Sequence, residues 1–176
     1  MREFFEDVLR LPYKPNSQDN PLHENQVEEL LIKHGIDYVA QPNGIQRSPD
    51  FRVNYSDNNY DIECKSSKGH YPTFNGGLPK PGVIYIFSSK KYDQTTIFFA
   101  DDVVKESKRK LYNELLSEFD MILKRYQSNL GWQDDDRGFD FYMRAMYTQR
   151  GEAMKTDYFI HKERKRCEQK ILAYNW

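Results

Sequence analysis

Apolar side chains recur at helical spacing in two stretches near the start of the chain. In residues 2–11 they fall at positions 4, 5, 8, 9 and 11, which is the spacing of one helix face. A second helix is predicted over 23–35, where Gly35 would supply the C-terminal cap. Its apolar face holds Val27, Leu30, Leu31 and His34.

Strand patterns follow in the middle of the chain. In "DFRVNY" and "YDIECK" side chains alternate between two faces, and the turn-rich "SDNN" connects them. The apolar run 83–89 suits a buried central strand, and 95–100 reads as a further strand. Residues 36–49 are predicted as a short strand or loop.

A long helix is predicted from Asp101 or Asp102, either of which would be a natural N-cap, to about residue 127. Helical periodicity predicts that one side of it is buried. That side comprises Val104, Leu111, Leu115, Phe119, Ile122 and Tyr126. Further along, 141–151 fits a strand or a helix, and 161–175 fits a terminal helix.

This order of elements predicts an α/β (α+β) fold, a mixed central sheet flanked by helices. The 176 residues fit one domain, 1–176, with a full core, and 38% apolar and 15% aromatic residues exclude a disordered chain. The net charge of -1 does not by itself indicate a nucleic-acid binder. Two cysteines, a charged N-terminus and the lack of a long apolar run predict a soluble, cytoplasmic protein without a membrane partner.

The paired strands carry an unusual set of charges. Glu63 and Lys65 share one strand face, and Asp50 begins the neighbouring strand. Converging carboxylates repel each other, and a divalent cation such as Mg²⁺ would relieve that repulsion, with the Cys64 carbonyl as a further oxygen ligand. Lys65 could orient or deprotonate a water, which suits phosphodiester hydrolysis. Asp61 shares the face of Glu63 and either touches metal or faces solvent; the alternative for the whole hairpin is a solvated surface.

The motif "PD", twelve residues, then "ECK" resembles the PD-(D/E)xK nuclease superfamily. The resemblance implies a restriction-endonuclease-like core over about 23–127. It implies that Asp50 and Glu63 are metal ligands and that Lys65 is the catalytic lysine. It also implies a supporting acid on the preceding helix, for which the sequence offers Glu24 and Glu28.

The segment after the motif is predicted to lie near the scissile phosphate. Ser66, Ser67, Lys68 and His70 could donate hydrogen bonds to phosphate oxygens. Asn75, with Tyr71 and Phe74, could stack on or read bases. The alternative is a Gly/Pro-rich connector with Phe74 tucked into the core.

Residues 128–176 would form a C-terminal, DNA-binding decoration of the core. Residues 144–170 hold eight Lys and Arg against four acids, and the weak candidates for base readout are Arg144, Gln149 and Arg150. For 161–170 the solvated face of an amphipathic helix is the preferred interpretation.

The sequence therefore predicts a Mg²⁺-dependent endonuclease acting on double-stranded DNA, most similar to a type II restriction endonuclease. A repair or junction-resolving nuclease, or a DNA-binding protein without catalysis, are the alternatives. The family includes homodimers and monomers, so the oligomeric state stays open.

Overall fold

The computed structural model describes residues 1–17, 20–45, 47–129, 141–143, 145–148 and 159–176. Its helices are α1 (Arg2–Val8), α2 (Leu22–Lys33), α3 (Ala100–Val103), α4 (Glu106–Asn129) and α5 (Arg164–Leu172). Its strands are β1 (Asn16–Ser17), β2 (Asn20–Pro21), β3 (Asp37–Ala40), β4 (Phe51–Tyr55), β5 (Asn58–Ser67), β6 (Thr73–Phe74), β7 (Ile84–Ser89), β8 (Gln94–Phe99) and β9 (Tyr147–Thr148).

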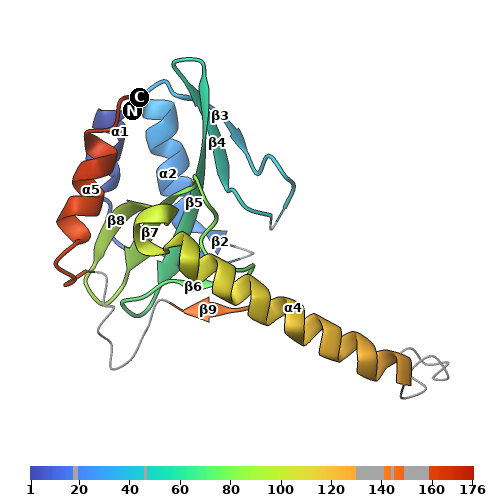
Figure 1. Ribbon diagram of the computed structural model, residues 1–176. Helices are drawn as coiled ribbons and strands as arrows, with labels where there is room; N and C mark the ends of the chain where they lie inside the picture. Colours follow the sequence, from blue (N-terminus) through green and yellow to red (C-terminus); the bar gives the residue numbers. More distant parts are fainter. Residues whose placement is uncertain (18–19, 46, 130–140, 144, 149–158) are drawn as a thin grey trace.

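A five-stranded sheet in the order β3-β4-β5-β7-β8 forms the centre of the molecule. Strands β5 and β7 are parallel, and the other neighbours are antiparallel. The connection from β5 to β7 is the loop 68–83, which carries β6. The fold is thus a mixed α/β sheet with helices, as the sequence predicts (Figure 1).

One face of the sheet is covered by α1, α2 and α5, which pack on one another and on the strands. Alternate residues of the central strands point into this core, because strand side chains alternate between faces. Its fully buried members include Phe4, Phe5, Val27, Leu31, Ile62, Ile86, Ile97 and Ile171. The C-terminal helix therefore belongs to the body of the fold, and its charged residues form the solvated side of an amphipathic helix.

The opposite face holds a smaller aromatic core. Tyr85 stacks on Phe98 at 5.7 Å, and Phe74 meets the Tyr85 ring edge-on at 5.5 Å. Phe159 lies against Phe87 at 5.5 Å. This face also carries Glu63 and Lys65, which stand beside Tyr85 and Phe87 in the parallel register.

The long helix differs from its prediction in two ways. It begins at Glu106, after the short helix α3 and an extended residue, Val104. Asp101 is therefore not its cap; this side chain accepts from the Gly82 N–H at 3.0 Å and pairs with Arg109 at 3.0 Å.

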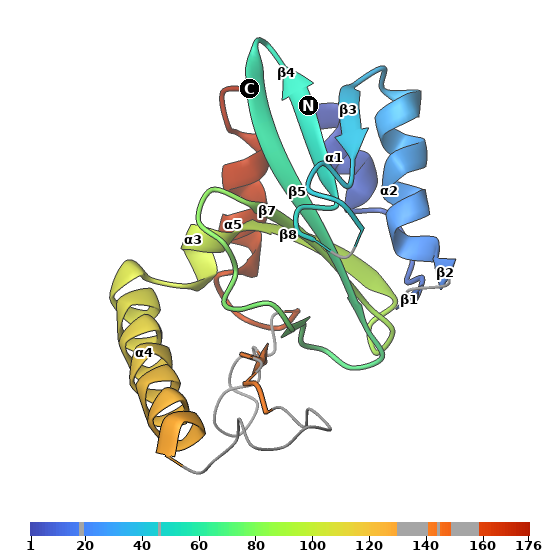
Figure 2. The same cartoon turned by 90° about the vertical axis from the view of Figure 1, so that its right-hand side faces the viewer.

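The expected burial of one side of this helix is wrong. Leu111, Leu115, Phe119, Ile122 and Tyr126 are exposed. Figures 1 and 2 show why: α4 extends away from the five-stranded sheet, although Tyr147 of β9 contacts Tyr112 near the start of the helix.

Among the described residues, none of the helices combines the length and the apolar character that crossing a membrane demands.

Candidate functional site

The start of β4 and the far half of β5 bring Asp50 and Glu63 side by side. Extending the antiparallel register of these strands by one position sets Asp50 opposite Glu63. The Asp50 N–H donates to the Ile62 carbonyl at 3.1 Å, and the Cys64 N–H donates to Oδ2 of Asp50 at 2.6 Å. Regular pairing stops there because Pro49 has no N–H. Beyond Glu63, the backbone edge of β5 lies next to the carboxylate of Asp50 and not next to a paired residue of β4.

Glu63 is a buried carboxylate that is only half satisfied. Its Oε1 accepts from Nζ of Lys65 at 2.5 Å, and its side chain is 8% exposed. Its Oε2 is buried and has no hydrogen-bond partner among the described residues. A buried charged oxygen without a partner is costly. This atom therefore marks a position where a cation or a donor is needed.

Asp50 is held in an environment that opposes its ionisation. Burial, and then the negative charges of Glu63 and Glu24, raise the pKa of Asp50 to about 7, although the Cys64 N–H and Lys65 act the other way. The pKa of a carboxyl group rises when the group is buried and when other negative charges lie close to it. A divalent cation beside Asp50 would oppose this shift, because a positive charge favours the ionised carboxylate.

Lys65 is held in its charged form. Burial by itself would lower the pKa of Lys65, but the charge and hydrogen bond of Glu63, together with Asp50, outweigh it and the pKa is raised. An ammonium group that stays protonated at neutral pH can donate to a water or a phosphate oxygen. It is a poor proton acceptor, so the geometry favours the orienting role over deprotonation of water.

Glu24, near the start of α2, is the helix acid that reaches this site. Burial raises the pKa of Glu24, and Lys65 opposes the shift. The side chain of Asn16 holds the carboxylate by donating to Oε1 of Glu24 at 2.8 Å. The same Asn16 accepts from the N–H groups of His23 and Glu24 at 3.1 Å each, and so completes the N-terminus of α2. Glu28 lies one turn further along and instead accepts from the Tyr38 hydroxyl at 2.8 Å.

Cys64 contributes its backbone to the site and its side chain to the core. The thiol is buried on the opposite face of β5, and burial raises its pKa well above the usual value. In a strand the N–H and C=O of one residue point to the same side. Because the Cys64 N–H points to Asp50, its carbonyl lies along the same open edge, where the expected metal ligand belongs.

Two cavities meet at Lys65. One, of about 440 Å³, is lined by Glu24, Asp50, Lys65 and Asn75. The other, of about 580 Å³, is lined by Glu63, Lys65 and Asn75. The second also has a polar and basic rim, which comprises Asn43, Arg47 and Lys80. The candidate catalytic residues thus lie where these two cavities meet.

The predicted DNA-contacting residues fall into three groups. Ser66, Ser67 and Asn75 line the first cavity; the two serine hydroxyls accept from the N–H groups of Asn16 at 2.8 Å and Gly69 at 3.0 Å. Lys68 is exposed, whereas His70 is buried against Tyr71. Phe74 is a core residue, as the alternative interpretation has it, and is 4% exposed. Arg144, Gln149 and Arg150 lie outside the described residues.

Asp61 is drawn away from the site by a partner of its own. Arg52 donates to both of its oxygens, at 2.7 Å and 3.0 Å. The two residues face each other across β4 and β5 and line a separate hollow. Of the two interpretations of Asp61, the structure supports a strand residue outside the candidate metal site.

Asn16, Arg47 and Lys80 are the residues near the site that sequence reasoning missed. Asn16 lies far from the motif along the chain and carries no local signal. Arg47 precedes Asp50 by only three residues, and Lys80 stands in the Gly/Pro-rich loop after the motif. Basic residues flanking a carboxylate pair were a usable signal for an anionic substrate.

The donor set fits a hard cation. Among the described residues, no group of three or more His, Cys, Asp and Glu is arranged to hold a metal ion. The candidate set comprises Asp50, Glu63 and a backbone carbonyl, which suits Mg²⁺ because this ion keeps several of its waters. A cation at this position would meet the Glu63 oxygen that has no partner among the described residues, and it would oppose the rise in the pKa of Asp50 that burial, Glu63 and Glu24 cause.

Comparison with known proteins adds no relative to this picture. The chain matches no protein-family model, no curated protein and no solved structure. A function for the site must therefore be argued from its own residues.

Proposed function

We propose that the protein is a Mg²⁺-dependent endonuclease that hydrolyses phosphodiester bonds of double-stranded DNA, of the type II restriction kind. The observation that carries the proposal is the buried oxygen of Glu63 that has no partner among the described residues, beside Asp50 and the protonated Lys65. Most buried side-chain oxygens have a hydrogen-bond partner. Oδ2 of Asp102 also lacks one among the described residues, but Glu63 in addition lines a cavity and lies beside a second carboxylate. An arrangement that leaves one open, at a cavity, is typical of a site that binds something else.

Asp50, Glu63 and the Cys64 carbonyl would hold the cation, and Glu24 would support it from α2. When bound, the cation supplies Lewis acidity toward a phosphate oxygen and makes a neighbouring water more acidic. Glu24 is fixed for this task by Asn16, whose own N–H donates to Ser66 on β5 at 2.8 Å. Through these two hydrogen bonds Asn16 connects α2 to β5 at the site.

Lys65 would orient the attacking water and offset the negative charge that grows on the phosphate. The water oxygen bonds to phosphorus, the bond from phosphorus to the 3′ oxygen breaks, and the leaving oxygen takes up a proton. Because Lys65 also pairs with Glu63, its ammonium group is positioned before substrate arrives. Such preorganised charge is the main source of electrostatic catalysis.

A nucleic-acid strand is the substrate that the surroundings of the site favour. Arg47 and Lys80 line the cavity next to Glu63 and Lys65, and Lys68 is exposed just beyond β5. Cationic side chains beside a carboxylate pair suit a polyanion that approaches a metal. Sequence specificity is part of the proposal through the resemblance of the motif and the loop 68–83 that follows it.

Plasmid cleavage tests the proposal. Supercoiled DNA is incubated with the protein and Mg²⁺, with EDTA as the metal control, and the product ends are sequenced. Discrete fragments with one common end sequence are expected. A smear, or a preference for branched DNA, would indicate a nuclease of another kind. Intact plasmid that is nevertheless bound by the protein would rule out catalysis.

A further inference from the structure

The loop segment 79–82, with the sequence Pro-Lys-Pro-Gly, is held at both of its ends by polar contacts. Arg109, near the start of α4, is 6% exposed and donates from Nη1 to the Pro79 carbonyl. Its Nη2 donates to Oδ1 of Asp101 at 3.0 Å, and Oδ2 of Asp101 accepts from the Gly82 N–H at 3.0 Å. A guanidinium group holds its acceptors in a fixed geometry because its donors are coplanar. The segment is thus bound to α3 and α4.

Lys80, in the middle of this segment, lies beside the candidate site. Its N–H donates to the Tyr85 hydroxyl at 3.0 Å, and Tyr85 stands next to Glu63 in the parallel register of β5 and β7. Its side chain lines the same cavity as Glu63 and Lys65, and its Nζ donates to the Ser48 carbonyl at 3.4 Å. The segment therefore places an ammonium group at the cavity that holds the candidate catalytic residues.

The charge of Lys80 is available to a ligand. Lys80 is exposed and forms no ion pair with an acid among the described residues, whereas Lys65 pairs with Glu63. A lysine ammonium has three N–H donors, and the Ser48 carbonyl uses one of them. An ammonium group with open donors, next to a candidate cation site, suits a phosphate that is bound at the same time as the cation.

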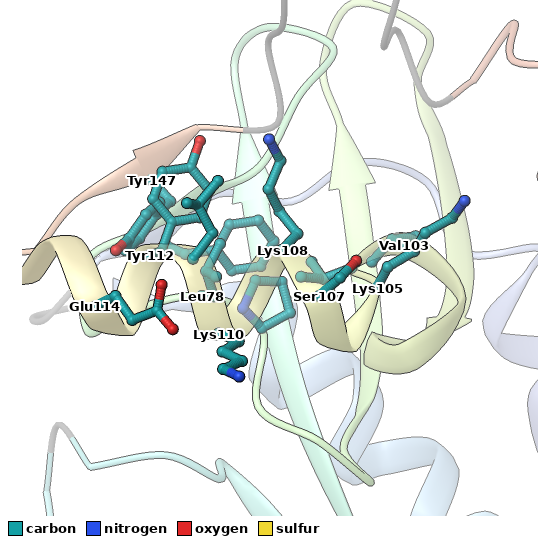
Figure 3. Close-up of a pocket in the computed structure, with 13 residues that line it drawn as sticks. Leu78, Val103, Lys105, Ser107, Lys108, Lys110, Tyr112, Glu114 and Tyr147 are labelled. Carbon is teal, nitrogen blue, oxygen red and sulfur yellow. The ribbon is translucent and has the colours of Figure 1, made fainter.

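Apolar packing alone does not fix the position of the segment. On the side away from the site, a cavity of about 870 Å³ is lined by Leu78 and Pro79 together with Tyr112 and Tyr147. Figure 3 shows Leu78, Tyr112 and Tyr147 grouped on one side of α4. Leu78 also lines the cavity of the candidate site, so the chain at this point separates the two cavities. The open space beside α4 leaves room for the segment to move, and the hydrogen bonds of Arg109 oppose that movement.

We infer that Lys80 binds a backbone phosphate adjacent to the scissile one, and that Arg109 and Asp101 are positioning residues that hold Lys80 in place. This inference rests on the proposed nuclease function and adds a substrate contact to it. The ammonium group of a lysine is a point charge on a flexible stem, so the backbone decides where that charge lies. Near Lys80 the backbone includes Gly77 and Gly82, with φ of +108° and +73°, and glycine is the residue with the greatest conformational freedom. Fixed contacts from α3 and α4 are therefore needed to keep Lys80 at the site.

Steady-state cleavage of supercoiled plasmid in Mg²⁺ tests the phosphate contact. Lys80→Ala is expected to raise KM by about tenfold and to leave kcat within about twofold, because the contact is the same in the bound substrate and in the transition state. Lys80→Arg keeps the charge and should restore most of the affinity. Lys108→Ala is the matched control and should keep the wild-type KM, because Lys108 is an exposed lysine that lines only the cavity beside α4.

A double-mutant cycle tests the positioning role. Arg109→Gln and Asp101→Ala are each expected to raise KM in the otherwise wild-type protein, but by less than about twofold when Lys80→Ala is already present, because both act through Lys80. A merely structural role would change KM equally in both backgrounds. The Asp101 side chain is 53% exposed, so Asp101→Ala provides the cycle if Arg109→Gln is unfolded by circular dichroism.

The outcomes distinguish this inference from the proposed function. A wild-type protein that does not cleave plasmid would overturn the proposed function, on which the inference rests. Cleavage with an unchanged KM in Lys80→Ala, or an equal rise of KM in Lys108→Ala, would overturn the inference alone. Equal effects of Asp101→Ala with and without Lys80→Ala would overturn the positioning role.

Discussion

Strand β5 and helix α4 depart from the rule of apolar inside and polar outside in opposite directions. Glu63 is buried in the fold with an oxygen that has no partner among the described residues, whereas α4 holds Leu115 and Phe119 out to solvent. Each arrangement is costly in the isolated chain. The kind of cost differs, since Glu63 on β5 has a charged oxygen without a partner among the described residues, whereas α4 has apolar side chains in contact with solvent. The comparison shows that a residue in an unexpected environment indicates which kind of group should bind beside it.

Removal of the site's charges should have the largest effect. Lys65→Ala and Asp50→Asn are each expected to lower the rate of plasmid cleavage by about 10³-fold, the magnitude typical of lost electrostatic stabilisation. Gel assays of nicked and linear DNA measure it.

The matched controls for these variants are Asp61→Asn and Lys90→Ala. Asp61 is an acid on the same face of β5 but is bound by Arg52, and Lys90 is an exposed lysine. Both variants should keep the wild-type rate within a few fold. If Asp61→Asn lost as much activity as Asp50→Asn, the contrast between a carboxylate at the candidate site and one bound by Arg52 would be wrong.

Truncation of apolar residues should distinguish the buried core from the exposed side of α4. Ile62→Ala is expected to lower the free energy of unfolding by about 2–5 kcal/mol, because Ile62 is fully buried under the helices. Leu111→Ala on α4 should lower the free energy of unfolding by less than about 1 kcal/mol. Urea denaturation at low protein concentration measures both losses. Equal losses in the free energy of unfolding would mean that the exposed side of α4 is covered within a single chain.

The pH dependence of stability should expose the strain at Asp50. Its pKa is raised from 3.8 to about 7, so between these values the folded protein holds a proton that the unfolded chain has released. Asp50 therefore contributes a fall in stability of the metal-free wild type as pH rises from about 4 to 7, whereas His23, whose pKa burial lowers to about 4, contributes a rise over part of the same range. Comparison with an Asp50 variant isolates the Asp50 contribution, because His23 is present in both proteins. Asp50→Asn removes this penalty and can still accept from the Cys64 N–H.

Thermal or urea unfolding in EDTA should accordingly show Asp50→Asn to be more stable than wild type at pH 8, by about 1–3 kcal/mol. The two proteins should converge near pH 4. Asp61→Asn, with its exposed ion pair gone, should show no such gain. An Asp50→Asn variant that is no more stable than wild type at pH 8 would remove the electrostatic argument for a cation.

Mg²⁺ should produce a modest gain in stability. At a concentration about ten times its dissociation constant, it is expected to raise stability by about 1.4 kcal/mol, or about 3–6 °C in melting temperature. The rise should be present at pH 8 and absent at pH 5, where Asp50 is protonated. It should also be absent in Asp50→Asn. A rise of equal size in that variant would place the cation elsewhere.

The sequence was sufficient for the parts of the molecule that depend on local periodicity. The two-residue period predicted that Glu63 and Lys65 share a face, and a short turn predicted that Asp50 starts the neighbouring strand. The same reasoning could not distinguish Asp61 from Glu63, since only the register brings Arg52 opposite Asp61. Likewise Glu24 and Glu28 share a helix face, and contacts from Asn16 and Tyr38 decide which one reaches the site.

The error on α4 has a different origin. A helical period reports that a helix has an apolar side, but it does not report what covers that side. Leu115 and Phe119 were assigned to the core because most apolar stripes pack within their own chain. The break at Val104 and Lys105 turns the helix away from the sheet instead, and two residues between helices leave little trace in the sequence.

The hydrogen bond from the Cys64 amide to Asp50 provides a spectroscopic reporter. Because that amide donates at 2.6 Å to Oδ2 of Asp50, its proton resonance should move when the carboxylate is protonated or ligated. In protein labelled with nitrogen-15, a single assigned peak in a correlation spectrum would then follow both events without substrate.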